Sequence, residues 1–146
     1  MFKHILVATD GCALSERAIA AALDLAKSLG ASVTGVTVSE PFHLVGIDAA
    51  VSVTEPEDAY RARCDKRAAG YLKVVTTTGT KAGVPTSVLH QYAEHPYEAI
   101  IDAALANGCD VICMASHGRK GFRALVLGSE TTKVLTHSTI PVLVLR

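Results

Sequence analysis

The chain has 146 residues, the length of one domain with a sizeable core, and its 14 basic and 14 acidic residues give a formal net charge of zero. This balance argues against long-range attraction to nucleic acid or to an anionic membrane surface, and we expect neither as a partner. No apolar stretch approaches the roughly 20 residues of a membrane-spanning helix. Because the amino terminus also lacks a signal-peptide pattern, we expect a cytoplasmic protein.

Four cysteines, Cys12, Cys64, Cys109 and Cys113, are scattered without a CxxC pair. A domain of this length does not need disulfides, so we expect reduced thiols. Cys109 and Cys113 bracket a predicted strand. With a rise of about 3.3 Å per residue they lie too far apart along an extended backbone to bridge each other.

Strand and helix patterns alternate through the first part of the chain. Residues 5–8 are an all-apolar strand that stops at a polar turn, 9–11. Ser15 is a suitable cap for the helix predicted over residues 15–29. A β-branched run over residues 32–39 predicts the second strand.

The middle of the chain is less regular. Residues 41–54 have no clear period and are too apolar for a solvated linker, so we expect an ordered flap. A helix with a charged, solvated face is predicted over residues 57–77. The strand predicted over residues 84–91 contains Pro85, which cannot donate to a ladder and therefore favours a strand start or an edge position.

The last part of the chain resumes the alternation. A helix begins at Pro96 and stops at an Asn-Gly pair, 107–108. A short apolar strand over residues 111–114, a helix over 129–136 and a strand over 141–145 complete the pattern.

This succession of elements predicts a single α/β domain. Five strands separated by helices, four of them nearly continuous in apolar residues, indicate a doubly wound, Rossmann-like parallel sheet covered on both faces. Ligands of such sheets bind at the strand carboxyl ends, where the strand order reverses. The first and fourth strands end in residues 8–10 and 115–118, and these ends adjoin if the order is 3-2-1-4-5. The chain has no Walker A sequence and is therefore not a P-loop ATPase.

The connection after the fourth strand has the features of a phosphate-binding loop. The strand ends in Ala115, Ser116, His117 and Gly118, and a basic segment with Arg119, Lys120 and Arg123 follows. Gly128 then precedes Ser129, which is suited to cap the next helix. A glycine loop with cations that leads into a helix N-terminus offers an anion both free N–H donors and a favourable dipole. We therefore expect this loop to hold phosphates.

The spacing in this loop resembles the signature of the universal stress protein family. In its ATP-binding members the loop reads Gly, two residues, Gly, nine residues, Gly, then Ser or Thr. Gly118, Gly128 and Ser129 match this pattern, whereas Ala115 stands in place of the first glycine. That departure adds one methyl group where the backbone approaches the nucleotide. The resemblance extends from residues 3–11 to residues 140–145.

The resemblance implies the strand order 3-2-1-4-5 and a bound ATP. Among the carboxylates near the loop, Asp10 is the candidate for holding Mg²⁺. One side of the implied pocket is lined by Ala8, Thr9 and Asp10, and the backbone at Val38 meets the adenine. The ribose and triphosphate are implied to lie among Met114, Ala115, Gly118, Gly128, Ser129, Glu130 and Thr131. The loop residues Ser116, His117, Arg119 and Gly121 complete the predicted binding segment.

The resemblance also implies association through the last strand. Residues 140–145 form the most apolar terminal segment, and in this strand order they lie at an edge with one row of backbone groups unpaired. We therefore expect a homodimer. The alternative is that Pro141 and Arg146 blunt an edge that faces solvent.

Other interpretations of these residues stay open. Asp10 is also suited to cap its own turn, Ser129 to act only as a helix cap, and the loop cations to be solvated. His117 has no Cys or second His at metal spacing. Without a G-x-S-x-G elbow or a Cys–His pair, we expect at most slow ATP hydrolysis. The alternatives are a dimeric interaction module that binds no nucleotide and a slow AMP-transfer enzyme, which normally carries an SGGxDS-type loop where this chain has residues 9–13.

Overall fold

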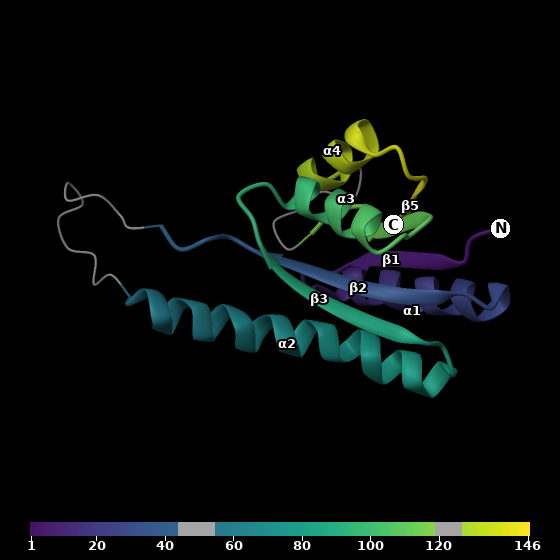
Figure 1. Cartoon of the computed structure of the whole chain (residues 1–146), viewed down its shortest axis with the longest axis horizontal. Helices are drawn as coiled ribbons and strands as arrows, with labels where there is room; N and C mark the ends of the chain where they lie inside the picture. Colours follow the sequence, from purple (N-terminus) through teal and green to yellow (C-terminus); the bar gives the residue numbers. More distant parts are fainter. Residues whose placement is uncertain (44–54, 119–126) are drawn as a thin grey trace.

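A computed structural model of the chain describes residues 1–43, 55–118 and 127–146. It shows one α/β domain with a five-stranded sheet between layers of helices (Figure 1). The strands are β1 (His4–Ala8), β2 (Ser32–Ser39), β3 (Thr86–Tyr92), β4 (Val111–Ala115) and β5 (Val142–Leu145). The helices are α1 (Ala13–Leu29), α2 (Glu57–Ala82), α3 (Pro96–Ala106) and α4 (Ser129–His137). No helix in these ranges is long and apolar enough to cross a membrane.

The strand order is β3-β2-β1-β4-β5, with every neighbouring pair parallel. The predicted fold class and strand order are therefore confirmed. β1 lies at the centre, where Val7 is in register with Gly35 of β2 and with Cys113 of β4. From β1 the chain continues to β2 on one side of the sheet, whereas β4 is followed by β5 on the other side. The strand order therefore reverses between β1 and β4. Their carboxyl ends are thus brought together at one place on the sheet edge.

The two faces of the sheet bury alternate residues of the same strands. Ile5 and Val7 pack with α1 and α2, whereas Leu6 packs with α3 and α4, and all three side chains are 0% exposed. Continuous apolar runs are what a sheet covered on both faces requires. β3 lies at an edge, as Pro85 suggested, and Val88 on it is 38% exposed.

Two helix boundaries differ from the sequence predictions. Helix α1 begins at Ala13 with Cys12 as its N-cap, whose sulfur accepts from the backbone N–H of Ser15, so the prediction that Ser15 caps this helix is wrong. Helix α2 continues to Ala82, because Gly79 remains helical and lets the Thr86 side chain approach where a Cβ would collide. Gly83, with φ +71°, then ends the helix in the left-handed conformation that glycine tolerates.

The four cysteines are free thiols, as expected. Burial raises the pKa of Cys113 to about 12. Burial, with a smaller effect of the nearby Asp110 charge, raises the pKa of Cys109 to about 11. Both thiols are therefore poor nucleophiles at neutral pH, because the thiolate is the reactive form.

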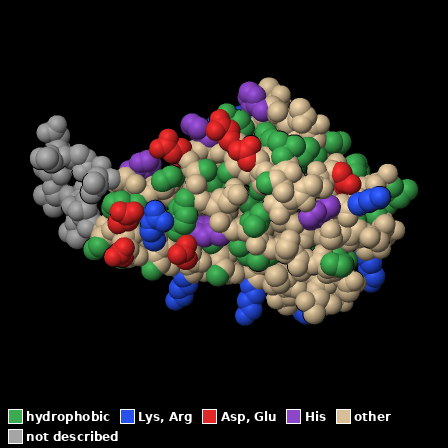
Figure 2. Space-filling view, viewed as in Figure 1, with side chains coloured by type: hydrophobic (Ala, Val, Ile, Leu, Met, Phe, Trp, Pro, Cys, Tyr) green, Lys and Arg blue, Asp and Glu red, His purple; other side chains and the backbone are tan. Residues whose placement is uncertain are grey.

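The face of the molecule drawn in Figure 2 shows no large field of one sign. Figure 2 shows Lys and Arg side chains spaced along the rim that α2 forms, and Asp and Glu side chains on other parts of the same face. This mixture agrees with a formal net charge of zero. Any anion site on this face must therefore rely on local donors and not on a long-range potential.

Candidate functional site

The carboxyl ends of β1 and β4 and the start of α4 meet at the point where the strand order reverses. The backbone N–H of Gly128 donates to the carbonyl oxygen of Ser116 at 2.7 Å. The hydroxyl of Thr131, which is 3% exposed, donates to the carbonyl oxygen of Ala115 at 2.9 Å. These two bonds hold the first turn of α4 against the end of β4. The sequence-predicted residues on either side of the nine-residue connection are therefore adjacent in space.

The first turn of α4 supplies backbone donors without a side-chain cap. Gly128 is the N-cap, so the prediction that Ser129 caps this helix is wrong, and Ser129 is instead the exposed first residue. The first N–H groups of a helix have no acceptor within the helix. Since Gly128 has no side chain to satisfy them, they remain suited to an anion at this edge.

Gly128 is required here for close packing and not for an unusual conformation. Its φ of −61° is open to any residue. A Cβ built on it would lie 3.1 Å from the Cα of His117 and 3.4 Å from the carbonyl oxygen of Ser116. The expected flexibility of this glycine is therefore less important than its small size, which lets α4 approach the end of β4.

Asp10 and Gly118 face each other across the site. A Cβ on Gly118 would lie 2.6 Å from Oδ2 of Asp10, so the chain after β4 passes directly beside this carboxylate. The other carboxylate oxygen, Oδ1, accepts from the backbone N–H of Cys12 at 3.1 Å. Asp10 thus stabilises its own turn and also borders the predicted pocket, and the two interpretations drawn from the sequence are compatible.

Thr9 organises the turn after β1 from the inside. It is 6% exposed, its hydroxyl lies 3.0 Å from that of Ser15, and it accepts from the N–H of Gly11 at 3.2 Å. Ser15 also donates to the carbonyl oxygen of Cys12 at 2.9 Å. Sequence reasoning missed this role of Ser15, because a serine near a helix start is equally suited to capping, and only the packing of α1 on β1 brings the two hydroxyls together.

The side chain of Glu130 serves the neighbouring helix. Its Oε2 accepts from the backbone N–H of Tyr97 at 2.9 Å, and its Oε1 pairs with Nζ of Lys133 at 3.0 Å. It therefore supplies a negative charge to the N-terminus of α3, where His95 is the N-cap without a side-chain bond of its own. Tyr97 and Lys133 were not among the predicted site residues, and no local pattern in the sequence indicates this contact.

The remaining predicted residues lie in or beside the strands. Ala115 is the last residue of β4 and pairs with Leu145, so its extended backbone does not require glycine. Met114 is buried, and Ala8 and Val38 pack against the same core cluster as Met114. Ser116 is 5% exposed, and its hydroxyl lies 3.2 Å from Nδ1 of His117.

Part of the prediction cannot be placed. Arg119 and Gly121 lie outside the described residues, as do the loop cations Lys120 and Arg123 and most of the expected flap. Within the described ranges, no three His, Cys, Asp or Glu side chains gather in a way that could hold a metal ion. Among the described residues, Asp10 therefore belongs to no such group.

A cavity of about 530 Å³ lies at the end of β3 and the first turns of α3. It is lined by Gln91, Tyr92, Ala93, Glu94, His95, Glu98, Ala99 and Asp102. None of the predicted nucleotide residues lines it. Three of its lining side chains are carboxylates, which disfavours phosphate there.

Comparison with known proteins identifies relatives along the whole chain. The profile of the universal stress protein family matches residues 1–146. A universal stress protein of Thermus aquaticus is 33% identical over 149 residues and covers 100% of both chains. The universal stress protein YxiE of Bacillus subtilis is 30% identical, again with 100% of both chains covered.

Solved structures show the same fold. A universal stress family protein from Burkholderia pseudomallei superimposes with a TM-score of 0.75 at 25% identity and covers 98% of this chain and 95% of its own. A universal stress protein in complex with cAMP has a TM-score of 0.73 at 18% identity, with 99% and 97% covered. One from Archaeoglobus fulgidus in complex with dAMP has a TM-score of 0.65 at 20% identity, with 99% and 98% covered. At such identities the last two likenesses concern the fold alone.

Proposed function

This chain belongs to the universal stress protein family, and from that premise we propose that it binds ATP at the edge formed by β1, β4 and the start of α4. The protein then acts as a nucleotide-dependent regulator of a cytoplasmic stress response and not as an enzyme of rapid turnover. Slow hydrolysis of the bound ATP remains compatible with this role.

The observation that carries the proposal is the pair of hydrogen bonds that hold α4 against β4. They run from Gly128 to Ser116 and from Thr131 to Ala115, and they direct the first N–H groups of α4 to the edge where β1 also ends. Helix N-termini bind phosphate through such N–H groups and through the helix dipole. A phosphate at this place would be bound mainly by backbone groups, which fits the small residues found there.

Adenine is supported by the fold relatives. Two of them were determined with cAMP and with dAMP bound, and these ligands share the adenine ring and a phosphate with ATP. The preference for ATP rests on the glycine spacing of this chain, which resembles that of ATP-binding members. Val38, at the end of β2, is the residue proposed to meet the adenine.

The residues present fit a magnesium nucleotide. The space between Gly118 and Oδ2 of Asp10 is one that a Cβ would fill, and Ala115 occupies an extended position that an alanine adopts without strain. Mg²⁺, when bound, neutralises phosphate charge, and Asp10 is the carboxylate proposed to hold it.

Calorimetric titration with ATP and Mg²⁺, followed by displacement with cAMP or dAMP, tests the proposal. At a ligand concentration of 100 times Kd, binding should stabilise the fold by about 2.7 kcal/mol in a thermal unfolding experiment. Absence of both heat and a thermal shift at millimolar ATP would overturn it. Ala115→Gly should leave the affinity equal or higher, because the alanine methyl group is at most a mild obstacle.

Gly118→Val is a sharper probe of the pocket than a change at Gly128. The new side chain at the exposed position 118 would meet the end of the flexible Asp10 side chain, whereas a valine at position 128 would press on the backbone of His117. Gly118→Val should therefore abolish ATP binding with little loss of stability. Thr136→Val, which alters an exposed hydroxyl bonded to Thr132 on the far part of α4, is the matched control and should bind ATP normally.

The second candidate is a dimeric interaction module that binds no nucleotide. Its support is the edge strand β5, on which Leu143 is 40% exposed. In this candidate, β5 pairs with its copy in a second chain and the dimer acts without a bound nucleotide. Light scattering should give a dimer mass at micromolar concentration, and lysine at Val142 and Val144 should yield a monomer. A monomeric wild-type chain would remove this proposal without affecting the one for ATP.

A further inference from the structure

A second polar constellation lies on the face of the sheet that α2 covers, toward the ends of β2 and β3. The hydroxyl of Ser39 lies 2.9 Å from Nε2 of His90. Nδ1 of the same imidazole lies 3.2 Å from Oδ1 of Asp65 on α2. The hydroxyl of Tyr92 donates to the same Asp65 oxygen at 2.7 Å. Three groups from three elements are thus aligned in the order hydroxyl, imidazole, carboxylate.

The partners of His90 define its tautomer. An ionised carboxylate only accepts hydrogen bonds, so Nδ1 of His90 must carry the proton that is shared with Asp65. In the neutral ring Nε2 is then the acceptor, and the Ser39 hydroxyl donates to it. This is the arrangement in which an imidazole can remove the proton of a serine while a carboxylate orients the ring.

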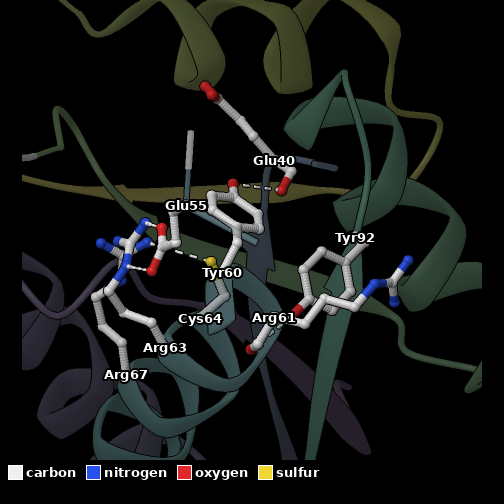
Figure 3. Close-up of polar contacts among 8 residues, drawn as sticks. All are labelled: Glu40, Glu55, Tyr60, Arg61, Arg63, Cys64, Arg67 and Tyr92. Carbon is white, nitrogen blue, oxygen red and sulfur yellow. Dashed lines mark hydrogen bonds and ion pairs between the residues drawn. The ribbon is translucent and has the colours of Figure 1, made fainter. Parts of the chain in front are cut away.

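The constellation borders a groove. A cavity of about 540 Å³ lies between α2 and β3. It is lined by Asp65, Ala69, Leu72, Lys73, Thr76, Val88 and His90. Figure 3 shows Tyr92 beside Arg61 at the end of this region, where the guanidinium lies 5.2 Å from the ring centroid. His90 is 18% exposed in its side chain and Ser39 is 9% exposed, so the imidazole faces the groove and the serine lies behind it.

We propose that Ser39, aligned with His90 and Asp65 beside this groove, is a nucleophile that accepts an acyl group from small activated esters. Oγ of Ser39 bonds to the acyl carbon while its proton passes to Nε2 of His90. The bond between the acyl carbon and the leaving oxygen then breaks, and the leaving group takes that proton. The products are an acylated Ser39 and a free alcohol. Water can later attack the acyl carbon, with its proton passing to Nε2 of His90 and then to Oγ of Ser39, which releases the carboxylic acid and restores the serine.

The surroundings of Ser39 determine what kind of substrate fits. Because Ser39 is 9% exposed, only a short acyl group can reach it. The groove beside His90 offers an acyl group apolar contact with Leu72 and Val88, although Asp65 and Lys73 also line it.

The backbone around Ser39 makes turnover slow. Its carbonyl oxygen accepts from the N–H of Ala93, the residue directly after β3, at 3.0 Å. In a parallel ladder the N–H and C=O of one residue point toward the same neighbour, so the N–H of Ser39 is directed at β3 and not at a developing oxyanion. Loss of one such donor slows acyl transfer by about 100- to 1,000-fold. This loss slows acylation and deacylation alike. Because the leaving group of an activated ester departs more readily than the Ser39 alkoxide does during hydrolysis, the acylated serine should accumulate.

Incubation with p-nitrophenyl acetate tests the proposal. Release of p-nitrophenolate should show a burst followed by a slow phase, and peptide mass spectrometry should find the acetyl group on Ser39. His90→Gln should lower the rate of Ser39 acetylation by at least about 100-fold, the smallest usual contribution of a general base. Asp65→Asn should lower it by less, because the Asp65 side chain is 61% exposed.

Ser87 provides a matched control within the same protein. Ser87 lies on β3, as His90 does, and it is exposed. Its hydroxyl bonds to that of Thr34 at 2.7 Å and not to an imidazole. If exposure alone decided reactivity, Ser87 would be acetylated before Ser39. If His90 activates Ser39, we expect Ser39 to be acetylated first. The proposal is wrong if acetyl groups appear on lysines or on Ser87 but not on Ser39. It is also wrong if Ser39 is labelled at an unchanged rate in His90→Gln. If His90→Gln does not fold, the order of labelling in the wild-type chain decides the question by itself.

Discussion

Two regions at the carboxyl ends of the strands differ in the groups they present. The ends of β1 and β4 present backbone groups and small side chains. The ends of β2 and β3 present Ser39, His90 and two contacts with α2 that involve a tyrosine, Tyr60 or Tyr92. The first region is held by bonds between buried atoms, as between Thr131 and Ala115. The second also contains bonds between more exposed side chains around α2, such as the bidentate pair of Arg63 with Glu55 and the bond from Tyr60 to the Glu40 carbonyl (Figure 3).

The difference in exposure predicts a difference in energy. Thr9, Ser116 and Thr131 are 6%, 5% and 3% exposed, so breaking their bonds leaves buried groups unsatisfied. The partners around α2 are mostly exposed, with Arg61 and Glu57 each 54% exposed in the side chain, and such pairs contribute about 0–1 kcal/mol. The first region should therefore be sensitive in stability, and the second mainly in reactivity.

The largest effect is expected at the turn after β1. Gly11 has φ +76°, and a Cβ there would collide with the ring of Tyr71. Gly11→Val should cost about 3 kcal/mol or more, from backbone strain together with overpacking. Urea unfolding measures this cost. Gly70→Ala on α2, where a Cβ meets nothing within 4 Å, is the control and should stabilise by about 0.5–1 kcal/mol. If Gly11→Val and Gly70→Ala change the free energy of unfolding equally, the ring of Tyr71 does not oppose a side chain at position 11.

An intermediate effect is expected at the contact between α4 and β4. Thr131→Val keeps the shape of the side chain but removes the donor to Ala115, and it should cost about 1–2 kcal/mol and weaken ATP binding. Thr136→Val removes an exposed hydroxyl on the same helix and should cost less than about 0.5 kcal/mol. Thermal unfolding of the two variants, side by side, measures the difference. Equal stabilities would mean that the bond between Thr131 and Ala115 does not hold the site together.

The smallest effect is expected at Tyr92. Burial, followed by its hydrogen bond to Asp65, raises the pKa of Tyr92 to about 12 from an ordinary value of 10.0. Because the folded pKa is the higher one, the stabilisation is fully present below pH 10 and is lost as the pH rises from 10 toward 12. Tyrosine ionisation can be followed by ultraviolet titration of the wild-type chain and of Tyr92→Phe. The difference between the two curves should show one group that ionises above pH 10. Ionisation of Tyr92 near pH 10 would show that Asp65 is not its partner.

The relation between Glu130 and Tyr97 shows where sequence reasoning stops. A glutamate in the first turn of a helix next to a glycine loop is a reasonable candidate for the nucleotide site. The structure directs its carboxylate to the N-terminus of α3, 33 residues away in sequence. Ser39 and His90 lie 51 residues apart, with Asp65 between them in the sequence, and no spacing rule joins the three.

The sequence by itself determined the five strands, the strand order implied by family resemblance, and the loop between Ala115 and Ser129 as the candidate phosphate site. Apolar periodicity and glycine spacing are local properties, and they are written in consecutive residues. Tertiary structure alone decided which atoms cap α1 and α4, how Ser15 meets Thr9, and where His90 finds its partners. These contacts depend on how α2 and α4 pack on the sheet, and the packing of two distant segments has no signature in either segment alone.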